Sequence, residues 1–348
     1  MNETHPPTRT CLNRKSRRRH PLAARWSADH LQLHQRLLQQ PSLLPKGAPL
    51  LLAVSGGQDS MAMAALLLDL QRLHHWELLL WHGDHRLRDA STEQAQALGG
   101  WATGQGLAIE IETWKEPRGG EAAARQWRYG CLTQLAIERG IAHVLTAHTA
   151  SDKAETLILQ AARGSHRRGL ASLRPRRPLA AGIEVVRPLL GFSRTDTGRI
   201  CNELKLPVWP DPSNNDMGFS RNRVRHGVLP VLESLHPGAT RRLAQLSESL
   251  AQESENHDEL LRLALEQLIA ADNPRQLNRQ QLLALHPANQ AGVVQAWLQQ
   301  HNQDPLPAAS LGRLIEQLPL SAGPGQWDLA AGSQLSWNRE WIRLQGTP

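Results

Sequence analysis

The feature that most restricts how this chain can fold is a short glycine-rich turn between two apolar segments. Residues 50–54 form a strand-like apolar run, residues 55–60 read SGGQDS, and an apolar pattern of helical spacing follows. Paired glycines let the backbone approach a ligand closely, and the free N–H groups at a helix start favour an anion. The segment therefore predicts a phosphate-binding turn, although it lacks the lysine of the Walker pattern.

Strand-like and helical patterns alternate after this turn. Strands are expected at residues 50–54, 77–81, 108–113, 143–147 and 184–187, and helices at 60–75, 91–104, 121–139 and 152–163. Strands joined by single helices form parallel βαβ units with right-handed crossovers. We therefore predict an α/β fold with a doubly wound, mostly parallel, Rossmann-like sheet, whose ligands bind at the carboxyl ends of the strands.

The chain divides into three parts by composition. Residues 1–48 contain little apolar periodicity and carry a KSRRRH cluster, so we predict a flexible basic extension with a short helix over residues 28–40. Residues 49–235 hold the alternating pattern and are predicted to form the catalytic domain. Residues 236–348 are rich in Leu, Gln, Glu and Ala and end in a strand-like segment at 334–344. This composition predicts a smaller, mainly helical domain.

Cysteine usage and hydropathy limit the compartment and the kinds of site. Cys11, Cys131 and Cys201 are widely spaced and form no CxxC pair, which argues against a disulfide framework, a cysteine-built zinc site or a paired-thiol sulfur carrier. No apolar run reaches the ~18 residues that cross a bilayer. We expect a cytoplasmic protein with no membrane partner and no metal site built from protein ligands alone.

Positive charge is concentrated in two places along the chain. In residues 1–48, nine Lys and Arg face two acidic residues, which equals the net charge of +7 of the whole chain. Residues 163–225 carry thirteen Lys and Arg against five acidic residues. Basic segments at a tail and near a phosphate-binding turn favour a nucleic-acid partner, whereas a solvated charged surface is the alternative interpretation.

A second candidate site follows the fourth predicted strand. Asp152 and Glu155 are spaced i, i+3 at the start of a helix and project from the same side of its first turn. Two such carboxylates can hold Mg²⁺ or an ammonium group. Helix capping is the alternative, because Thr149 and Asp152 fit a capping box, but capping explains Glu155 less well.

Arginines occur at helical spacing in two further segments. Arg125 and Arg128 share a helix face with Glu121, and Arg221 and Arg225 can share another. Planar guanidinium groups suit phosphate, whereas for Arg125 and Arg128 an internal ion pair with Glu121 is the competing interpretation. The residues alone leave both interpretations open.

The segment GDHRLR at residues 83–88 follows the second predicted strand. Asp84 there either caps a turn or contributes to the site, and the two interpretations have equal support. The glycine-flanked basic loop at residues 163–170 suits a phosphate backbone.

The order of these motifs resembles that of the tRNA(Ile)-lysidine synthetase family of PP-loop ATP pyrophosphatases. SGGQDS is followed by GDHRLR, EAAARQWRY, TAHTASDKAET, RGSHRRGL, RPLL, DPSN and SRNRVRH. The resemblance covers about residues 49–232 and is weaker in the helical region after residue 240. It implies a PP-loop fold for residues 49–235 and a tRNA-contacting role for residues 236–348.

The resemblance implies a two-step reaction on a tRNA(Ile) that carries a CAU anticodon. The 2-carbonyl oxygen of the wobble cytidine attacks the α-phosphorus of ATP and releases pyrophosphate. The ε-amine of free L-lysine then attacks the activated ring carbon, AMP departs, and lysidine is formed. ATP and Mg²⁺ are the implied cofactors.

The resemblance also implies roles for three groups of residues. The ATP-binding group consists of Ser55, Gly56, Gly57, Gln58, Asp59 and Ser60, with Asp59 near Mg²⁺. Asp152 and Glu155 match an acidic pair that receives the lysine ammonium. The arginines expected to stabilise phosphate charge during adenylation are Arg125, Arg128, Arg221 and Arg225.

The chain departs from the family pattern in two motifs. Thr149, Ser151 and Lys153 replace the second His, the first Asp and the Gln of the family's acidic-pair motif, and Lys153 adds a positive charge beside the expected ammonium site. Arg86 replaces a glycine in the motif after the second strand.

Two alternative functions compete with this one, another PP-loop tRNA-modifying enzyme and, from a different class, a non-catalytic RNA-binding protein. A PP-loop tRNA 2-thiolase would need a cysteine pair that this chain lacks. A non-catalytic RNA-binding protein would have no reason to keep an intact SGGQDS turn. The sequence leaves the oligomeric state open between a monomer and a homodimer.

Overall fold

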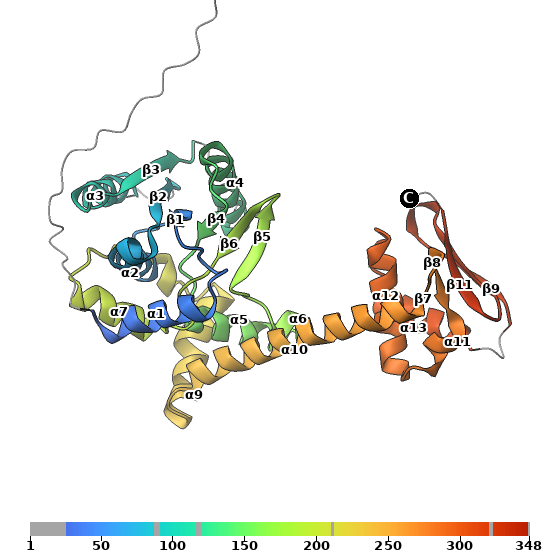
Figure 1. The fold of residues 1–348 in the computed structure, drawn as a ribbon. Helices are drawn as coiled ribbons and strands as arrows, with labels where there is room; N and C mark the ends of the chain where they lie inside the picture. The colour runs from blue at the N-terminus through green and yellow to red at the C-terminus, as the bar shows by residue number, and fades with distance from the viewer. Residues whose placement is uncertain (1–25, 87–90, 116–119, 210–211, 320–322, 347–348) are drawn as a thin grey trace, which may run out of the picture. The chain divides into compact units, whose positions relative to one another are not determined.

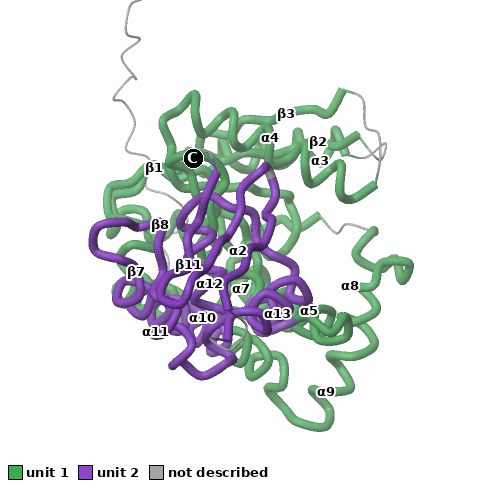
Figure 2. Tube along the Cα trace, turned by 90° about the vertical axis from the view of Figure 1, so that its right-hand side faces the viewer, with its two compact units in different colours: residues 1–165, 172–247 green, residues 166–171, 248–348 purple. Residues whose placement is uncertain are grey.

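The computed structural model describes residues 26–86, 91–115, 120–209, 212–319 and 323–346. They form two compact units, coloured in Figure 2. The first extends to residue 165 and includes residues 172–247, and the second contains residues 166–171 and those from 248 onward. The long helix α10 (Ala239–Leu268) begins in the first unit and ends in the second. The predicted domain boundary between residues 235 and 236 lies twelve residues before the observed boundary between residues 247 and 248, which falls within α10.

A six-stranded sheet organises the first unit. Its order is β3-β2-β1-β4-β6-β5, and every pair is parallel except β5 with β6. The strands are β1 (Pro49–Ala53), β2 (Glu77–Asp84), β3 (Ala108–Thr113), β4 (His143–Leu145), β5 (Arg176–Ala180) and β6 (Ile183–Val186). The prediction of a doubly wound, mostly parallel sheet is confirmed.

Helices cover both faces of this sheet (Figure 1). Alternation along β1 is the reason: Leu50 and Leu52 pack in the core with α2, whereas Leu51 faces the core that contains α4. The helices of this unit are α1 (Ala28–Gln39), α2 (Gln58–His74), α3 (Ser91–Gly104), α4 (Glu121–Arg139), α5 (Ala150–Ala162), α7 (Arg194–Glu203), α8 (Ser220–Arg223) and α9 (Leu229–Leu235).

Helix α1 is part of the first unit's core. Leu33 and Leu37 are buried in it, and Arg199 on α7 donates two hydrogen bonds of 2.7 Å to the Asp29 carboxylate. The extension expected over residues 1–48 thus contains a folded portion from residue 26. Residues 1–25 lie outside the described residues, so the expected flexible arm there stays a prediction.

The second unit combines helices with an antiparallel sheet of order β7-β8-β11-β10-β9. Its core is built around Trp297, which is fully buried. The elements are α6 (Arg167–Leu170), β7 (Ile269–Ala270), β8 (Asn273–Asn278), α11 (Arg279–Ala284), α12 (Pro287–Gln300), α13 (Ala308–Gln317), β9 (Gly325–Asp328), β10 (Gln334–Trp337) and β11 (Trp341–Gln345). The expected helices are present, and the strand-like segment at 334–344 contributes β10 and most of β11.

Among the described residues, none of the helices is both long enough and apolar enough to span a bilayer.

Candidate active site at the carboxyl edge of the sheet

The SGGQDS turn connects β1 to α2 in a conformation that only glycine adopts easily. Gly56 has φ +80°, and a Cβ there would lie 2.9 Å from the Gln94 side-chain nitrogen and 3.1 Å from the Trp209 ring. The Trp209 N–H also donates to the Gly56 carbonyl at 3.0 Å. Gly56 is therefore required both for its backbone angle and for the close approach of its neighbours.

The serines of the turn hold it in shape before any ligand binds. The Ser60 hydroxyl donates to the Gly57 carbonyl at 2.8 Å and accepts from the Ser55 N–H at 3.1 Å. Gly57 is the N-cap of α2 and supplies no capping side chain. The first N–H groups of α2 consequently stay available to an anion, as a phosphate-binding turn requires.

Gln58 and Asp59 direct their side chains to α7. The Gln58 amide donates to the Arg194 carbonyl at 2.6 Å. The Asp59 carboxylate accepts from Arg194 at 3.0 Å and from the Thr197 hydroxyl at 2.5 Å. Burial raises the pKa of Asp59, and the Arg194 charge only partly offsets this. Gln58 can thus contribute its backbone N–H to a ligand, while its side chain fixes α7.

Arg194 and Thr197 are site residues that the sequence interpretation missed. Both lie in the first turn and a half of α7, whose start is fixed by a capping box between Ser193 and Asp196. That S-x-x-D pattern is visible in the sequence and predicts where α7 begins. It does not reveal that α7 packs against the start of α2.

Asp152 performs two tasks with its two carboxylate oxygens. Oδ2 accepts from the Thr149 N–H at 2.7 Å and from the Thr149 hydroxyl at 2.9 Å, which is the capping box considered from sequence. Oδ1 faces the arginines, 3.1 Å from Arg221 and 3.5 Å from Arg225. Asp152 therefore caps α5 with one carboxylate oxygen and faces the site arginines with the other.

Glu155 is fully buried and held by the same two arginines. Its oxygens accept from Arg221 Nε and from Arg225 Nε, each at 2.7 Å, and from Arg225 Nη2 at 3.1 Å. Charge-assisted hydrogen bonds of this kind offset the cost of burying a carboxylate. Arg221 and Arg225, which the resemblance assigns to phosphate charge, are thus ion-paired with Glu155 in the structure.

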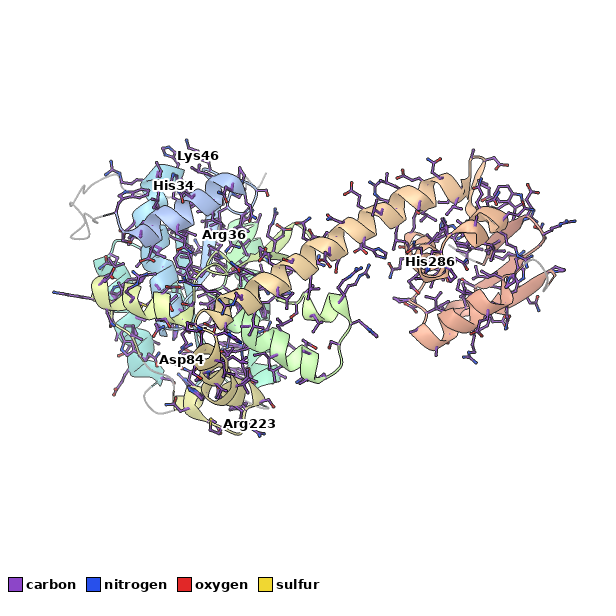
Figure 3. The ribbon with its side chains drawn as sticks, turned by 90° about the horizontal axis from the view of Figure 1, so that it is seen from below. His34, Arg36, Lys46, Asp84, Arg223 and His286 are labelled. Carbon is purple, nitrogen blue, oxygen red and sulfur yellow. The ribbon has the colours of Figure 1, made fainter. Side chains whose placement is uncertain are left out.

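An unusual helix brings the two arginines to the acidic pair. Arg221 lies on α8, and Arg225 lies in the π-helical turn η2 (Val224–Val228) that links α8 to α9. Single π-turns are often found at functional sites. Arg223, labelled in Figure 3, lies between them in sequence but is exposed.

Electrostatics link Asp59 to this ion-pair cluster. The negative charge of Asp152 raises the pKa of Asp59, and the positive charge of Arg225 lowers it. Burial would raise the pKa of Asp152, but Arg221, His148 and hydrogen bonds from Thr149 together hold it below its usual value. The SGGQDS turn and the acidic pair thus belong to one site.

His148 is a further member of the site and stays neutral there. Burial lowers its pKa to about 3, against the opposing effect of Asp152, and the arginines around it act in the same direction as burial. Its Nδ1 lies 3.0 Å from the Thr146 hydroxyl. The sequence analysis included His148 in a motif without giving it a role.

Arg125 and Arg128 lie apart from the ion-pair cluster, on the first half of α4. The Arg125 guanidinium stacks over the Tyr129 ring at 4.9 Å, and burial lowers the pKa of Arg128. The positive charge of Arg125 contributes to lowering the pKa of His148. These arginines therefore border the site without contributing to the pairs formed by Asp152 and Glu155.

The departures from the family motifs have structural counterparts. Lys153 is buried, with 2% of its surface exposed. Arg86 adopts φ +49°, the left-handed conformation for which glycine is favoured. The Asp84 carboxylate accepts from the Arg86 N–H at 3.0 Å and from the Thr92 hydroxyl at 3.2 Å. Asp84, labelled in Figure 3, therefore caps this turn.

Comparison with known proteins identifies the family. Residues 30–232 match a PP-loop domain family, ATP_bind_3. The chain is 48% identical over 332 residues to the tRNA(Ile)-lysidine synthase of Parasynechococcus marenigrum, covering 93% of this chain and 97% of that protein. It is 39% identical over 331 residues to that of Prochlorococcus marinus, covering 92% and 96%.

This chain belongs to the tRNA(Ile)-lysidine synthase family. The resemblance inferred from the order of the motifs is thereby confirmed. The chain is an enzyme, and its PP-loop domain uses ATP.

A solved structure supports the fold independently. The U34-tRNA thiolase NcsA from Methanococcus maripaludis superimposes with a TM-score of 0.53, covering 64% of this chain and 79% of that chain. The two sequences are 17% identical, so the likeness shows a shared PP-loop fold and nothing about the reaction.

Proposed function

We propose that this protein joins the ε-amine of lysine to C2 of the wobble cytidine in a tRNA(Ile) with a CAU anticodon. The observation that carries the proposal is that the SGGQDS turn, with the uncapped start of α2, shares one site with a buried acid–arginine cluster. Family membership supports the same reaction. We further infer that the protein acts in the cytoplasm.

In the first step the SGGQDS turn would bind the phosphates of ATP. The uncapped start of α2 and the serine-braced backbone support this role. The cytidine 2-carbonyl oxygen attacks the α-phosphorus, and pyrophosphate leaves. Cationic groups fixed in place before the reaction stabilise the negative charge that develops on the phosphate. Arg125 and Arg128, which have no ion pair to a carboxylate among the described residues, are the available candidates.

In the second step the ε-amine of lysine attacks C2 of the adenylated ring, and AMP leaves. We infer that Asp152 Oδ1 receives the lysine ammonium. Its present partner Arg221 has 37% of its side chain exposed, so lysine can displace it toward solvent. Glu155 is fully buried and bonded to both arginines, which supports a role in holding the cluster together.

Mg²⁺ fits the site only together with ATP. No group of three or more His, Cys, Asp or Glu within the described ranges can hold a metal. Mg²⁺ in ATP-using enzymes is commonly bound by one or two carboxylates and by the phosphates. Asp59 and Asp152, which influence each other's charge, would supply such carboxylates. The ion would then neutralise phosphate charge.

The thiolase alternative meets a chemical obstacle. Burial raises the pKa of Cys131 to about 12 and that of Cys201 to about 11. Sulfur transfer requires a thiolate, so both thiols would be unreactive near neutral pH. Cys11 lies outside the described residues.

Lysine incorporation tests the proposal. The purified chain, Mg-ATP and labelled lysine are incubated with a CAU-bearing tRNA(Ile) transcript or with a methionine tRNA that has the same anticodon. We expect label in the isoleucine tRNA alone. Pyrophosphate release without label would assign a different nucleophile, and neither signal in a folded sample would reject the proposed reaction.

A further inference from the structure

Four arginines of the first unit gather around one tyrosine. Arg125 and Arg177 place their guanidinium groups over the Tyr129 ring, 4.9 and 4.7 Å from its centroid. Arg128 and Arg187 lie close enough to interact electrostatically with the same tyrosine. We call these five residues the Tyr129 cluster. Only Arg125 and Arg128 were expected from sequence to be functional.

Strand register places this cluster at the ligand-binding edge of the sheet. Arg187 directly follows β6, which runs parallel to β4, so it lies at the carboxyl edge. Arg177 pairs with Val185 across the antiparallel β5–β6 ladder and therefore lies near the same edge. Tyr129 lies in the first half of α4, the helix that follows the carboxyl edge at β3.

Within the part of the chain that the structure describes, the arginines of the cluster have no carboxylate partners. Across the described ranges, no ion pair joins any of them to an Asp or Glu, whereas their neighbours are paired: Arg176 with Glu184 and Arg139 with Glu110. Arg187 has 3% of its surface exposed, and its buried Nε has no hydrogen-bond partner among the described residues.

The excess of positive charge lowers the pKa of Tyr129. Burial alone would raise the pKa of Tyr129, yet a hydrogen bond from Arg177 and the charges of three arginines bring it below its usual value. Like charges held this close repel one another unless an anion compensates them. The cluster is therefore suited to a phosphate group.

The position of Arg177 on β5 argues against the phosphates of ATP as the anion that this arginine binds. The phosphate-binding turn follows β1, and β4 and β6 separate β1 from β5 (Figure 1). Three strand spacings correspond to roughly 14 Å. A phosphate at Arg177 would then belong to a ligand that extends beyond ATP, such as a polynucleotide.

We propose that Tyr129, Arg177 and Arg187 bind a backbone phosphate of the tRNA close to the nucleotide that is modified, while Arg125 and Arg128 serve the adenylation step. This inference rests on the proposed function, because it takes tRNA as the substrate. A phosphate contact here would position the anticodon strand without reading its sequence.

Arg177→Gln and Arg139→Gln form a matched pair of variants for the test. Arg139 lies at the end of α4, away from Arg125 and Arg128 in the first half of that helix, and is exposed and paired with Glu110. The dissociation constant for tRNA(Ile) is measured over a range of salt concentrations, and the KM for ATP is measured by pyrophosphate release. Tyr129→Phe, which keeps the ring but removes the hydroxyl, is the second, milder variant.

We expect Arg177→Gln to weaken tRNA binding about tenfold and to reduce the slope of log K against log salt by about 0.7, with the KM for ATP unchanged. Arg139→Gln should leave both the affinity and the slope as in the wild type. Tyr129→Phe should weaken binding less than Arg177→Gln.

Two results would overturn the inference. One is a tRNA affinity and slope for Arg177→Gln equal to those of the wild type while the wild type incorporates lysine, which leaves the proposed function intact. The other is a raised KM for ATP with unaltered tRNA binding, which assigns the cluster to the nucleotide. Weakened tRNA binding in Arg177→Gln, with a wild type that binds tRNA but incorporates no lysine, would keep the inference and reject lysine transfer.

Discussion

The functional side chains of this site are bonded to one another, so each of them contributes to stability as well as to the proposed ligand binding. Glu155 is bonded to Arg221 and Arg225, and Asp59 is bonded to Arg194 and Thr197. Substituting one partner therefore changes both stability and binding, and the two effects have to be measured separately.

Removing Arg225 should destabilise the fold strongly. Arg225→Gln leaves the buried Glu155 carboxylate with one guanidinium, and breaking a buried pair costs about 3–5 kcal/mol. The exposed Arg223 is the matched control, and Arg223→Gln should change the free energy of unfolding by less than about 0.5 kcal/mol. Urea unfolding measures both values. Equal losses in the two variants would contradict the ion-pair assignment.

Asp152→Asn should affect lysine more than ATP. The substitution removes the charge expected to receive the ammonium, while an amide oxygen can still accept the Thr149 hydrogen bonds that cap α5. We expect the KM for lysine to rise at least about tenfold, since a charge-assisted hydrogen bond is lost, and the KM for ATP to change little. Steady-state kinetics with each substrate varied in turn gives both constants. A similar rise in both would argue against an ammonium site at Asp152.

His148 makes stability depend on pH in a defined direction. The unfolded ring binds a proton near its usual pKa of 6.5, but the folded ring does so only at about 3. Between these values the unfolded state holds more protons, so stability falls as pH is lowered. From pH 7 to pH 5 this loss is about 2 kcal/mol. Urea unfolding of the wild type and His148→Gln at both pH values should show that the variant lacks this part of the pH dependence. An identical pH dependence in both proteins would refute the assignment.

The roles of individual residues could be predicted only in part. The capping box of Thr149 and Asp152 is a local pattern, so sequence reveals it. The pairing of Glu155 with Arg221 and Arg225 depends on which helices meet, and residue spacing does not contain that information. The same holds for Arg177 and Arg187, which strand register brings to Tyr129.

Secondary structure elements with strong periodic patterns were predicted closely. The predicted strand at 108–113 and the predicted helices at 91–104 and 121–139 have the observed bounds of β3, α3 and α4. Strand β5 was missed because its sequence, RRPLA, combines two arginines with a proline at the edge of the sheet. Strands β7 to β9 are short, between two and six residues, and lack an alternating apolar pattern.

Two truncations of the basic N-terminal segment should differ in stability, because only the longer one removes helix α1. Deleting residues 2–25 leaves α1 and its bonds to α7 intact, so we expect an unchanged melting temperature. Because the deleted tail is basic, we also expect a smaller salt slope of tRNA binding. Deleting residues 2–40 also removes the buried Leu33 and Leu37, so the chain should lose several kcal/mol of stability. Thermal melting and tRNA titrations test both. A stable 2–40 deletion would show that α1 is not needed for folding.

At the scale of the whole molecule, the sheet and the SGGQDS turn followed from sequence, whereas the antiparallel sheet of the second unit did not. Parallel βαβ units repeat a long pattern of strand and helix, which survives local irregularity. The second unit's strands come from segments at 269–278 and 325–345 that pair across long sequence separations. Its fold therefore had to be read from the structure.

The central claim is that one site both adenylates a cytidine and transfers lysine to it. The most direct test is nucleoside analysis, by liquid chromatography and mass spectrometry, of a CAU-bearing tRNA(Ile) after reaction with this protein, ATP and lysine. The account predicts that the cytidine at the first anticodon position is replaced by a nucleoside that carries lysine through its ε-nitrogen. Unmodified cytidine at that position, or lysine attached elsewhere on the tRNA, would contradict it.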